Sequence, residues 1–185
     1  GYDATGNVRQ FDRDGDLSGT TGKINEAIFI CFSRLLTKDE IKKGSFSMTI
    51  ATGGLHDTPD GNLTINDSGS TTDYRVNSPA GEYGVLYTGS EALAGSGVGL
   101  LYYQAGVAVI SGSIFDTEFG SPGAPAGAQD TGSFNIVVTG SNISSSADGV
   151  RNRLHDLTFN NTTELNSTIY FCRASHGDFN YSSNP

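Results

Sequence analysis

The sequence predicts an all-β protein: a sandwich-like antiparallel domain of about seven to ten short strands, with an extended arm and tail. Three observations predict this class. The apolar segments are short and bounded by Gly, Asp, Asn or Pro. Residues 45–50 alternate polar and apolar side chains, and the 185 residues include 25 glycines, which suit tight turns. We expect at most one short helix.

The N-terminal third contains an arm followed by two apolar runs. Residues 1–22 are polar with scattered apolar side chains, so we expect an extended arm or loop. Periodicity does not assign the run "EAIFICFSRLL" to helix or strand. The next run places Phe46, Met48 and Ile50 on one face, which is typical of a half-buried strand. Because a strand needs a partner, we predict that the two runs form a hairpin through "TKDEIKKG".

The middle of the chain contains the strongest strand signals. The short segments "NLTIND", "DYRVNS" and "YGVLYTG" are expected strands. Residues 98–115 form the most apolar stretch, and residues 104–106 (Gln-Ala-Gly) divide it into two arms of about equal length. A continuous helix here would carry several interior glycines at a cost of about 1 kcal/mol each. We therefore predict a tight hairpin of two central strands.

The C-terminal third combines a loop, one short helix and two strands. Residues 117–132 are rich in Pro, Gly and Ala, so we expect a loop insertion at the surface. The segment "FNIVVTG" resumes the sheet. A helix of one or two turns is predicted from an N-cap at Asp148 to Leu154. The segment "TIYFCRA" is predicted to be a final strand.

These elements indicate one domain with extensions. We expect the arm at residues 1–22, the β domain at 23–178 and an extended tail at 179–185. The chain opens with glycine in a polar stretch and stops at "SSNP". We therefore expect it to be a segment of a longer polypeptide.

Charge and hydropathy argue against two classes of partner, nucleic acids and membranes. Lys and Arg number 11 against 20 Asp and Glu, so the net charge is −9. An acidic surface repels phosphates, so we expect no nucleic-acid partner. No apolar stretch reaches the roughly 20 residues that span a bilayer, so we expect no membrane partner. The densest basic cluster is a mixed-charge turn, which we predict to be an electrostatic docking turn formed by Lys38, Lys42 and Lys43.

One acidic stretch partly resembles a calcium loop. Asp12, Asp14 and Asp16 stand two residues apart, like the first three ligands of a helix-loop-helix calcium site. That site also needs glycine at its sixth position and glutamate at its twelfth, where this sequence has Leu17 and Lys23. An exposed turn is therefore favoured, and a metal site is the weaker alternative.

No constellation in the sequence predicts catalysis. His56, His155 and His176 lie in separate loop-like contexts without the spacing of a helical zinc site. Nucleophile and phosphate-loop motifs are absent from the sequence. Cys31 and Cys172 lie in apolar runs and are expected to be unpaired small hydrophobes, with a single disulfide as the alternative. We therefore expect a non-enzymatic protein with no cofactor.

Aromatic side chains suggest an interface. Four tyrosines lie between residues 83 and 103, and tyrosine is enriched at interfaces because it joins a flat apolar body to a polar tip. The domain's own core and rim explain these tyrosines equally well. The tail adds two further aromatic residues. We predict an interface formed by Tyr102, Tyr103, Phe179 and Tyr181.

Longer strings in the sequence are more specific than these motifs. The strings "FSRLLTKDEIKKGSFSMTI", "NSPAGEYGVLY", "LLYYQAGVAVISGSIF" and "NNTTELNSTIYFCRASHGDFNYSSNP" together resemble a virion structural protein of contractile-tailed bacteriophages that infect marine cyanobacteria. The resemblance runs, with gaps, from about Gly1 to Pro185. It implies a non-enzymatic component of the tail, neck or baseplate that assembles in the host cytoplasm. Its partners would be other copies of itself and other virion proteins.

Two other functions remain open at this stage. One is a carbohydrate-binding or adhesive β domain that binds a receptor through exposed tyrosines, with calcium at the acidic turn. The other is a capsid-associated decoration protein. For a virion subunit, we expect each copy to bury well over ~1,000 Å² against its neighbours.

Overall fold

The computed structural model describes residues 6–15, 22–54, 59–77, 80–89, 97–115, 143–163, 165, 167–173 and 177. Its strands form an eight-stranded antiparallel sheet in the order β1-β8-β7-β6-β4-β3-β9, with β5 paired to β6, and a second sheet of β2 and β10. The prediction of an all-β fold is therefore confirmed. The strands are β1 (Ala27–Cys31), β2 (Glu40–Ile41), β3 (Ser47–Gly54), β4 (Pro59–Asn66), β5 (Arg75–Asn77), β6 (Gly81–Thr88), β7 (Gly97–Tyr102), β8 (Val107–Ser111), β9 (Leu154–Thr158) and β10 (Asn161–Thr162).

The helices are short. The described residues form two α-helices, α1 (Arg34–Thr37) and α3 (Ile143–Arg153), where we expected at most one. Helix α3 begins at Ile143, so the prediction of an N-cap at Asp148 was wrong. Val150 of this helix is buried in the core. Packing of such an apolar side chain stabilises a helix more than the intrinsic propensity of its residues does. Over the same ranges the chain also forms two 3₁₀ turns, η1 (Ser68–Thr71) and η2 (Gly112–Ile114).

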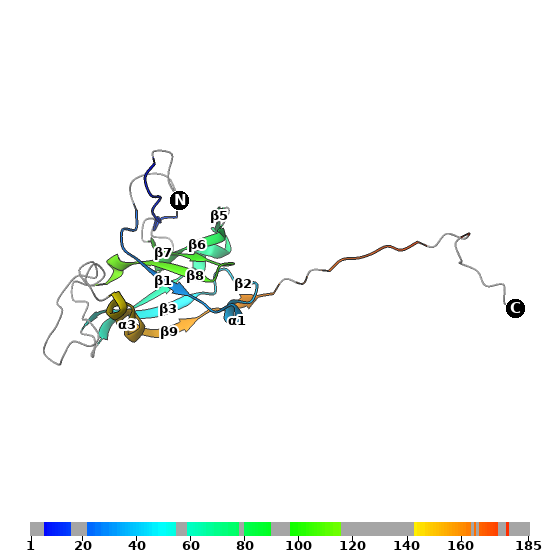
Figure 1. The fold of residues 1–185 in the computed structure, drawn as a ribbon. Helices are drawn as coiled ribbons and strands as arrows, with labels where there is room; N and C mark the ends of the chain where they lie inside the picture. The colour runs from blue at the N-terminus through cyan, green and yellow to red at the C-terminus, as the bar shows by residue number, and fades with distance from the viewer. Residues whose placement is uncertain are drawn as a thin grey trace.

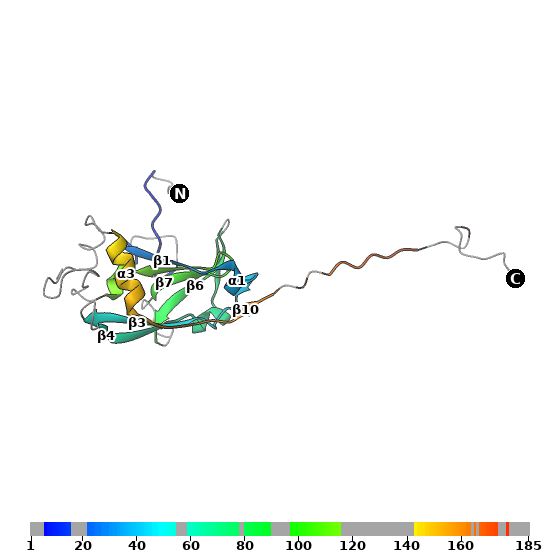
Figure 2. The same cartoon turned by 60° about the horizontal axis from the view of Figure 1, so that its bottom comes forward.

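The large sheet curls so that its two halves face each other across one core. Strands β1, β6 and β7 lie on one side and β3 and β4 on the other, with α3 between them at one end (Figure 2). This arrangement gives the sandwich-like character that the sequence predicts. The inner faces contribute the buried side chains of the core, among them Phe46, Met48, Ile50, Ile65, Leu86, Leu101 and Ile110.

Strand pairing agrees with one hairpin prediction and contradicts the other. Strands β7 and β8 form the predicted central hairpin, and its turn ends at Gly106 with a φ of 64°. The predicted hairpin between the first two apolar runs was wrong. Strand β1 pairs with β8, whereas β3 pairs with β4 and β9. Helix α1 turns the chain away after β1, so neighbours in sequence become separated in the sheet.

The chain leaves the folded body after β10. Residues 167–173 run as an extended segment that points away from the body (Figure 1, Figure 2). The prediction of a final strand at "TIYFCRA" was wrong for its described residues, 168–173, which pair with no strand in the described part of the chain. Strand propensity alone does not make a strand without a partner. The predicted loop at 117–132, the segment "FNIVVTG" and the tail from 179 lie outside the described residues.

The turn after α1 holds a strained residue. Lys38 ends this helix with a φ of 54° and a ψ of −119°, a backbone conformation that favours glycine. Its amide N–H donates to the carbonyl oxygen of Arg34, so Lys38 closes the last turn of the helix and its φ and ψ direct the chain after it.

Replacing this residue tests the strain. We expect Lys38→Gly to raise the free energy of unfolding by about 1 kcal/mol, because the strain is relieved by more than the added flexibility of the unfolded chain costs. Urea unfolding measures the change. Lys38→Ala is the matched control, and it should shift stability by less than about 0.5 kcal/mol because it keeps the strain. A loss of stability in the glycine variant would contradict the expectation.

Candidate assembly surfaces

The N-terminal segment covers the outer face of the sheet. Phe11 packs edge-on against Tyr102 with ring centroids 6.3 Å apart, and Tyr102 stacks on Tyr83 at 5.4 Å. The hydroxyl of Tyr83 donates to the carbonyl oxygen of Gly15 at 2.9 Å. Residues 11–15 therefore pack on their own sheet. Tyr102 is buried beneath them, which corrects our expectation that it faces a neighbouring subunit.

Tyr103 is fully buried on the inner face, so its predicted interface role is also corrected. Its hydroxyl donates to Asp67 Oδ2 at 3.0 Å. The same carboxylate accepts the amide N–H groups of Gly44 at 2.9 Å and Phe46 at 2.8 Å. Burial raises the pKa of Asp67, and these hydrogen bonds act against that rise. The carboxylate thus ties together the ends of β3, β4 and β7.

Only two of the three lysines of the predicted docking turn are free to contact a partner. Lys43 Nζ lies 2.5 Å from Glu82 Oε2 and 3.7 Å from Glu40 Oε1. Burial lowers the pKa of Lys43, but the hydrogen bond and charge of Glu82, with Glu40, outweigh it and leave the pKa raised. Lys43 is therefore engaged within its own chain. Lys38 and Lys42 remain exposed to solvent. The other two predicted interface residues, Phe179 and Tyr181, lie outside the described residues.

The acidic turn forms an ion pair with a lysine of the same chain. Lys23 Nζ lies 2.6 Å from Asp12 Oδ2, and the Asp12 side chain is fully buried. The amide of Asp14 donates to Asp12 Oδ1 at 3.2 Å, while Asp16 lies outside the described residues. Lys23 stands where a calcium loop has its closing glutamate. Within the described ranges, no group of three His, Cys, Asp or Glu side chains is placed to hold a metal.

The segment beyond β10 presents a run of highly exposed apolar side chains, and Leu35 on α1 is exposed to a similar degree. We call residues 165 and 167–173 the apolar arm. Within it, Ile169, Tyr170 and Phe171 are 74%, 83% and 94% exposed. The side chain of Leu165 is 92% exposed. The sequence signal for this arm was its strand-like composition, which we interpreted as a strand of the same domain.

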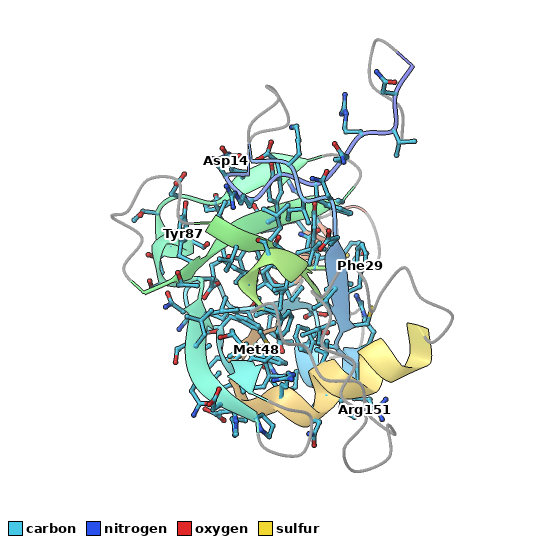
Figure 3. All side chains as sticks on the ribbon, turned by 90° about the vertical axis from the view of Figure 1, so that its left-hand side faces the viewer. Asp14, Phe29, Met48, Tyr87 and Arg151 are labelled. Carbon is cyan, nitrogen blue, oxygen red and sulfur yellow. The ribbon has the colours of Figure 1, made fainter. Side chains whose placement is uncertain are left out.

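An apolar groove lies at the open side of the curled sheet. It runs between β1 and α3, has a volume of about 270 Å³ and is lined mainly by aliphatic side chains. Figure 3 shows β1, with Phe29, and α3, with Arg151, on the same side of the molecule. We call this feature the edge groove, and its aliphatic lining comprises Ile28, Ile30, Ile50, Val150 and Leu154.

A buried arginine holds the helix beside this groove. The guanidinium Nη1 of Arg153 donates to the carbonyl oxygen of Gly53 at 2.5 Å, and the side chain is fully buried. Desolvation lowers the pKa of Arg153, whereas the charge of Asp60 raises it. This contact fixes the end of α3 against β3, so the groove has a firm wall.

One cysteine lies in the edge groove and the other on the apolar arm. Cys31 lines the edge groove and Cys172 belongs to the apolar arm; both are free thiols exposed to solvent. Our expectation that they pack as small hydrophobes is therefore wrong for this single copy. His155 is exposed on β9, whereas His56 and His176 lie outside the described residues.

Comparison with known proteins does not assign a function to these surfaces. No family model, no curated protein and no solved structure matches the chain. Within the described part of the chain, no helix has the length and apolar character needed to cross a membrane. The structure therefore defines the protein by class: an all-β domain with an exposed apolar arm and an apolar groove beside an edge strand.

The buried Tyr103 hydroxyl gives a test of the core. We expect Tyr103→Phe to lower the free energy of unfolding by about 2 kcal/mol, because the Asp67 carboxylate loses a hydrogen bond in a buried site. Urea unfolding measures the loss. Tyr170→Phe makes the same change on an exposed residue and should leave stability unaltered. Equal effects of the two substitutions would disprove the role of Tyr103.

The ion pair at the acidic turn gives a second test. A calcium site saturated at about 100 times its Kd would add about 2.7 kcal/mol to the stability. Because the Lys23 ammonium already neutralises Asp12, we expect no shift in Tm when millimolar calcium is added to chelator-treated protein. A rise of several degrees by differential scanning fluorimetry would restore the calcium alternative.

Proposed function

We propose that this protein is a non-enzymatic structural subunit of a bacteriophage virion, in the tail, neck or baseplate, that works by multi-copy assembly. The resemblance of its long sequence strings supports the phage context. The apolar arm is the observation that carries the assembly role, because Phe171 is 94% exposed in the single copy. A bare aromatic side chain on an extended segment gains stability when a partner covers it.

Simple energetics supports association through the arm. Burial of a side chain such as Ile or Phe contributes roughly 1.5–3 kcal/mol. The arm presents Ile169, Tyr170 and Phe171 in succession, and contiguous exposed apolar surface usually marks an interaction site. Strand addition to an open sheet edge is one way for such a segment to bind.

The carbohydrate-binding alternative is less favoured by the same geometry. It depended on exposed tyrosines, but Tyr83, Tyr102 and Tyr103 are buried within the domain. It also depended on calcium at the acidic turn, where Asp12 is paired with Lys23. A decoration protein on the capsid would use the same assembly surfaces as a tail component, and location in the particle distinguishes the two.

The proposal predicts where the protein is found and how it behaves at high concentration. We expect peptides of the chain in purified particles of contractile-tailed cyanobacterial phages by mass spectrometry. Immunogold labelling should place it at the tail, neck or baseplate. The isolated protein should form multimers in sedimentation velocity experiments. Absence from purified particles, or saturable binding on a glycan array, would overturn the proposal, and labelling of the capsid would favour the decoration protein.

A further inference from the structure

We infer that the apolar arm of one copy adds as an extra strand to the free edge of β1 in a second copy and fills its edge groove. Copies therefore join head to tail. This inference rests on the proposed assembly function and names the contact through which it operates.

The arm has the properties of a strand that lacks a sheet. Residues 167–173 read STIYFCR, with β-branched and aromatic residues in succession and no proline. Every residue in this range thus carries a backbone N–H and a C=O group. In the described part of the chain these groups meet no neighbouring strand. The arm can therefore donate and accept backbone hydrogen bonds along the edge of another strand.

Strand β1 has the complementary edge. It is the outermost strand of the large sheet, and among the described residues it pairs with β8 alone. Its five residues, Ala27–Cys31, are fewer than those of the segment 167–173, so this segment can pair along the whole strand. An edge strand with a free side is the usual acceptor in strand addition.

Both faces of the edge are apolar, as are both faces of the arm. Ile28 and Ile30 of β1 line the groove on the inner side, while Phe29 is 55% exposed on the outer side. Successive side chains of a strand point to opposite faces, so Phe171 and Tyr170 of the arm lie on different sides. A run that is apolar on both faces is typical of a strand covered on both faces. The arm and the edge therefore match face by face.

The arm points away from the body that carries it. Figures 1 and 2 show the arm directed outward, with α3, whose residues line the groove, at the other end of the body. The arm leaves the body near the Cys31 end of β1, because Phe32 and Phe159 pack with ring centroids 5.2 Å apart. Pairing within one chain would need the arm to reverse its direction and lie back along β1, whereas in the structure it extends outward.

Substitutions on exposed residues test the two surfaces without disturbing the core. Phe171→Asp disables the arm, and Ala147→Trp obstructs the groove from an exposed position on α3. Val76→Asp, at a 69% exposed site on β5, is the matched control. We expect each of the first two variants to weaken association by about 30-fold or more in sedimentation velocity, and the control to assemble like the parent. Circular dichroism and Tm establish that each variant is folded.

Mixing the two defective variants gives the sharpest result. Phe171→Asp keeps an intact groove and Ala147→Trp keeps an intact arm, so an equal mixture should form dimers and nothing larger. Parental assembly by either variant, or a mixture that stays monomeric, would overturn the inference.

The native cysteines supply an independent test of contact. A short bismaleimide should link Cys172 of one copy to β1 of another, at Cys31 if the strands are parallel. If they are antiparallel, the link should form in the double variant Ala27→Cys/Cys31→Ser. Covalent dimers and longer ladders on denaturing gels are the expected product, and Cys172→Ser should abolish them. A link within one chain, or no link in either background, would overturn the inference.

Failure of this inference and failure of the proposed function are distinguishable. If the protein is present in particles and assembles regardless of the arm and groove variants, the assembly function stands and this contact is wrong. If it is absent from particles, the proposed virion function is wrong whatever the variants do.

Discussion

An antiparallel sheet is held by backbone hydrogen bonds, and here the two outermost strands, β1 and β9, meet no further strand within the described residues. The sheet curls far enough to enclose a core but not far enough to join its own edges. Helix α3, fixed to Gly53 through Arg153, covers part of the opening. The edge groove is what remains, so its position follows directly from incomplete closure of the sheet.

Two further sets of contacts hold the strands together. The outer face of the central strands is covered by the N-terminal segment through Phe11, and the Asp67 carboxylate joins three strand ends from inside. These contacts use Tyr102 and Tyr103, which we had predicted from the sequence to form an interface. Exposed apolar side chains remain at the edge of β1, on α1, on β5 and on the arm, and among the described residues only the arm presents several of them in succession on an extended segment.

The fold class and the central hairpin were predictable because they depend on local patterns: alternation at 46–50, and a glycine turn between two apolar runs. Strand partners were not predictable in the same way. The pairing of β1 with β8 joins residues about 80 positions apart, and no local signal specifies it. The burial of Tyr103 depends on Asp67, Gly44 and Phe46, which no short motif connects. The segment "TIYFCRA" was recognised as strand-forming, but the absence of a partner from its own described chain is a tertiary property.

The proposed contact, between the arm of one copy and the groove of the next, has a consequence for growth. A contact between two different surfaces either closes into a ring or continues as a filament with direction. A filament of copies then has an unoccupied groove at one end and an unbound arm at the other. A different protein that offers only an arm, or only a groove, can start or stop the series, and thereby set its length without any change in the repeated subunit.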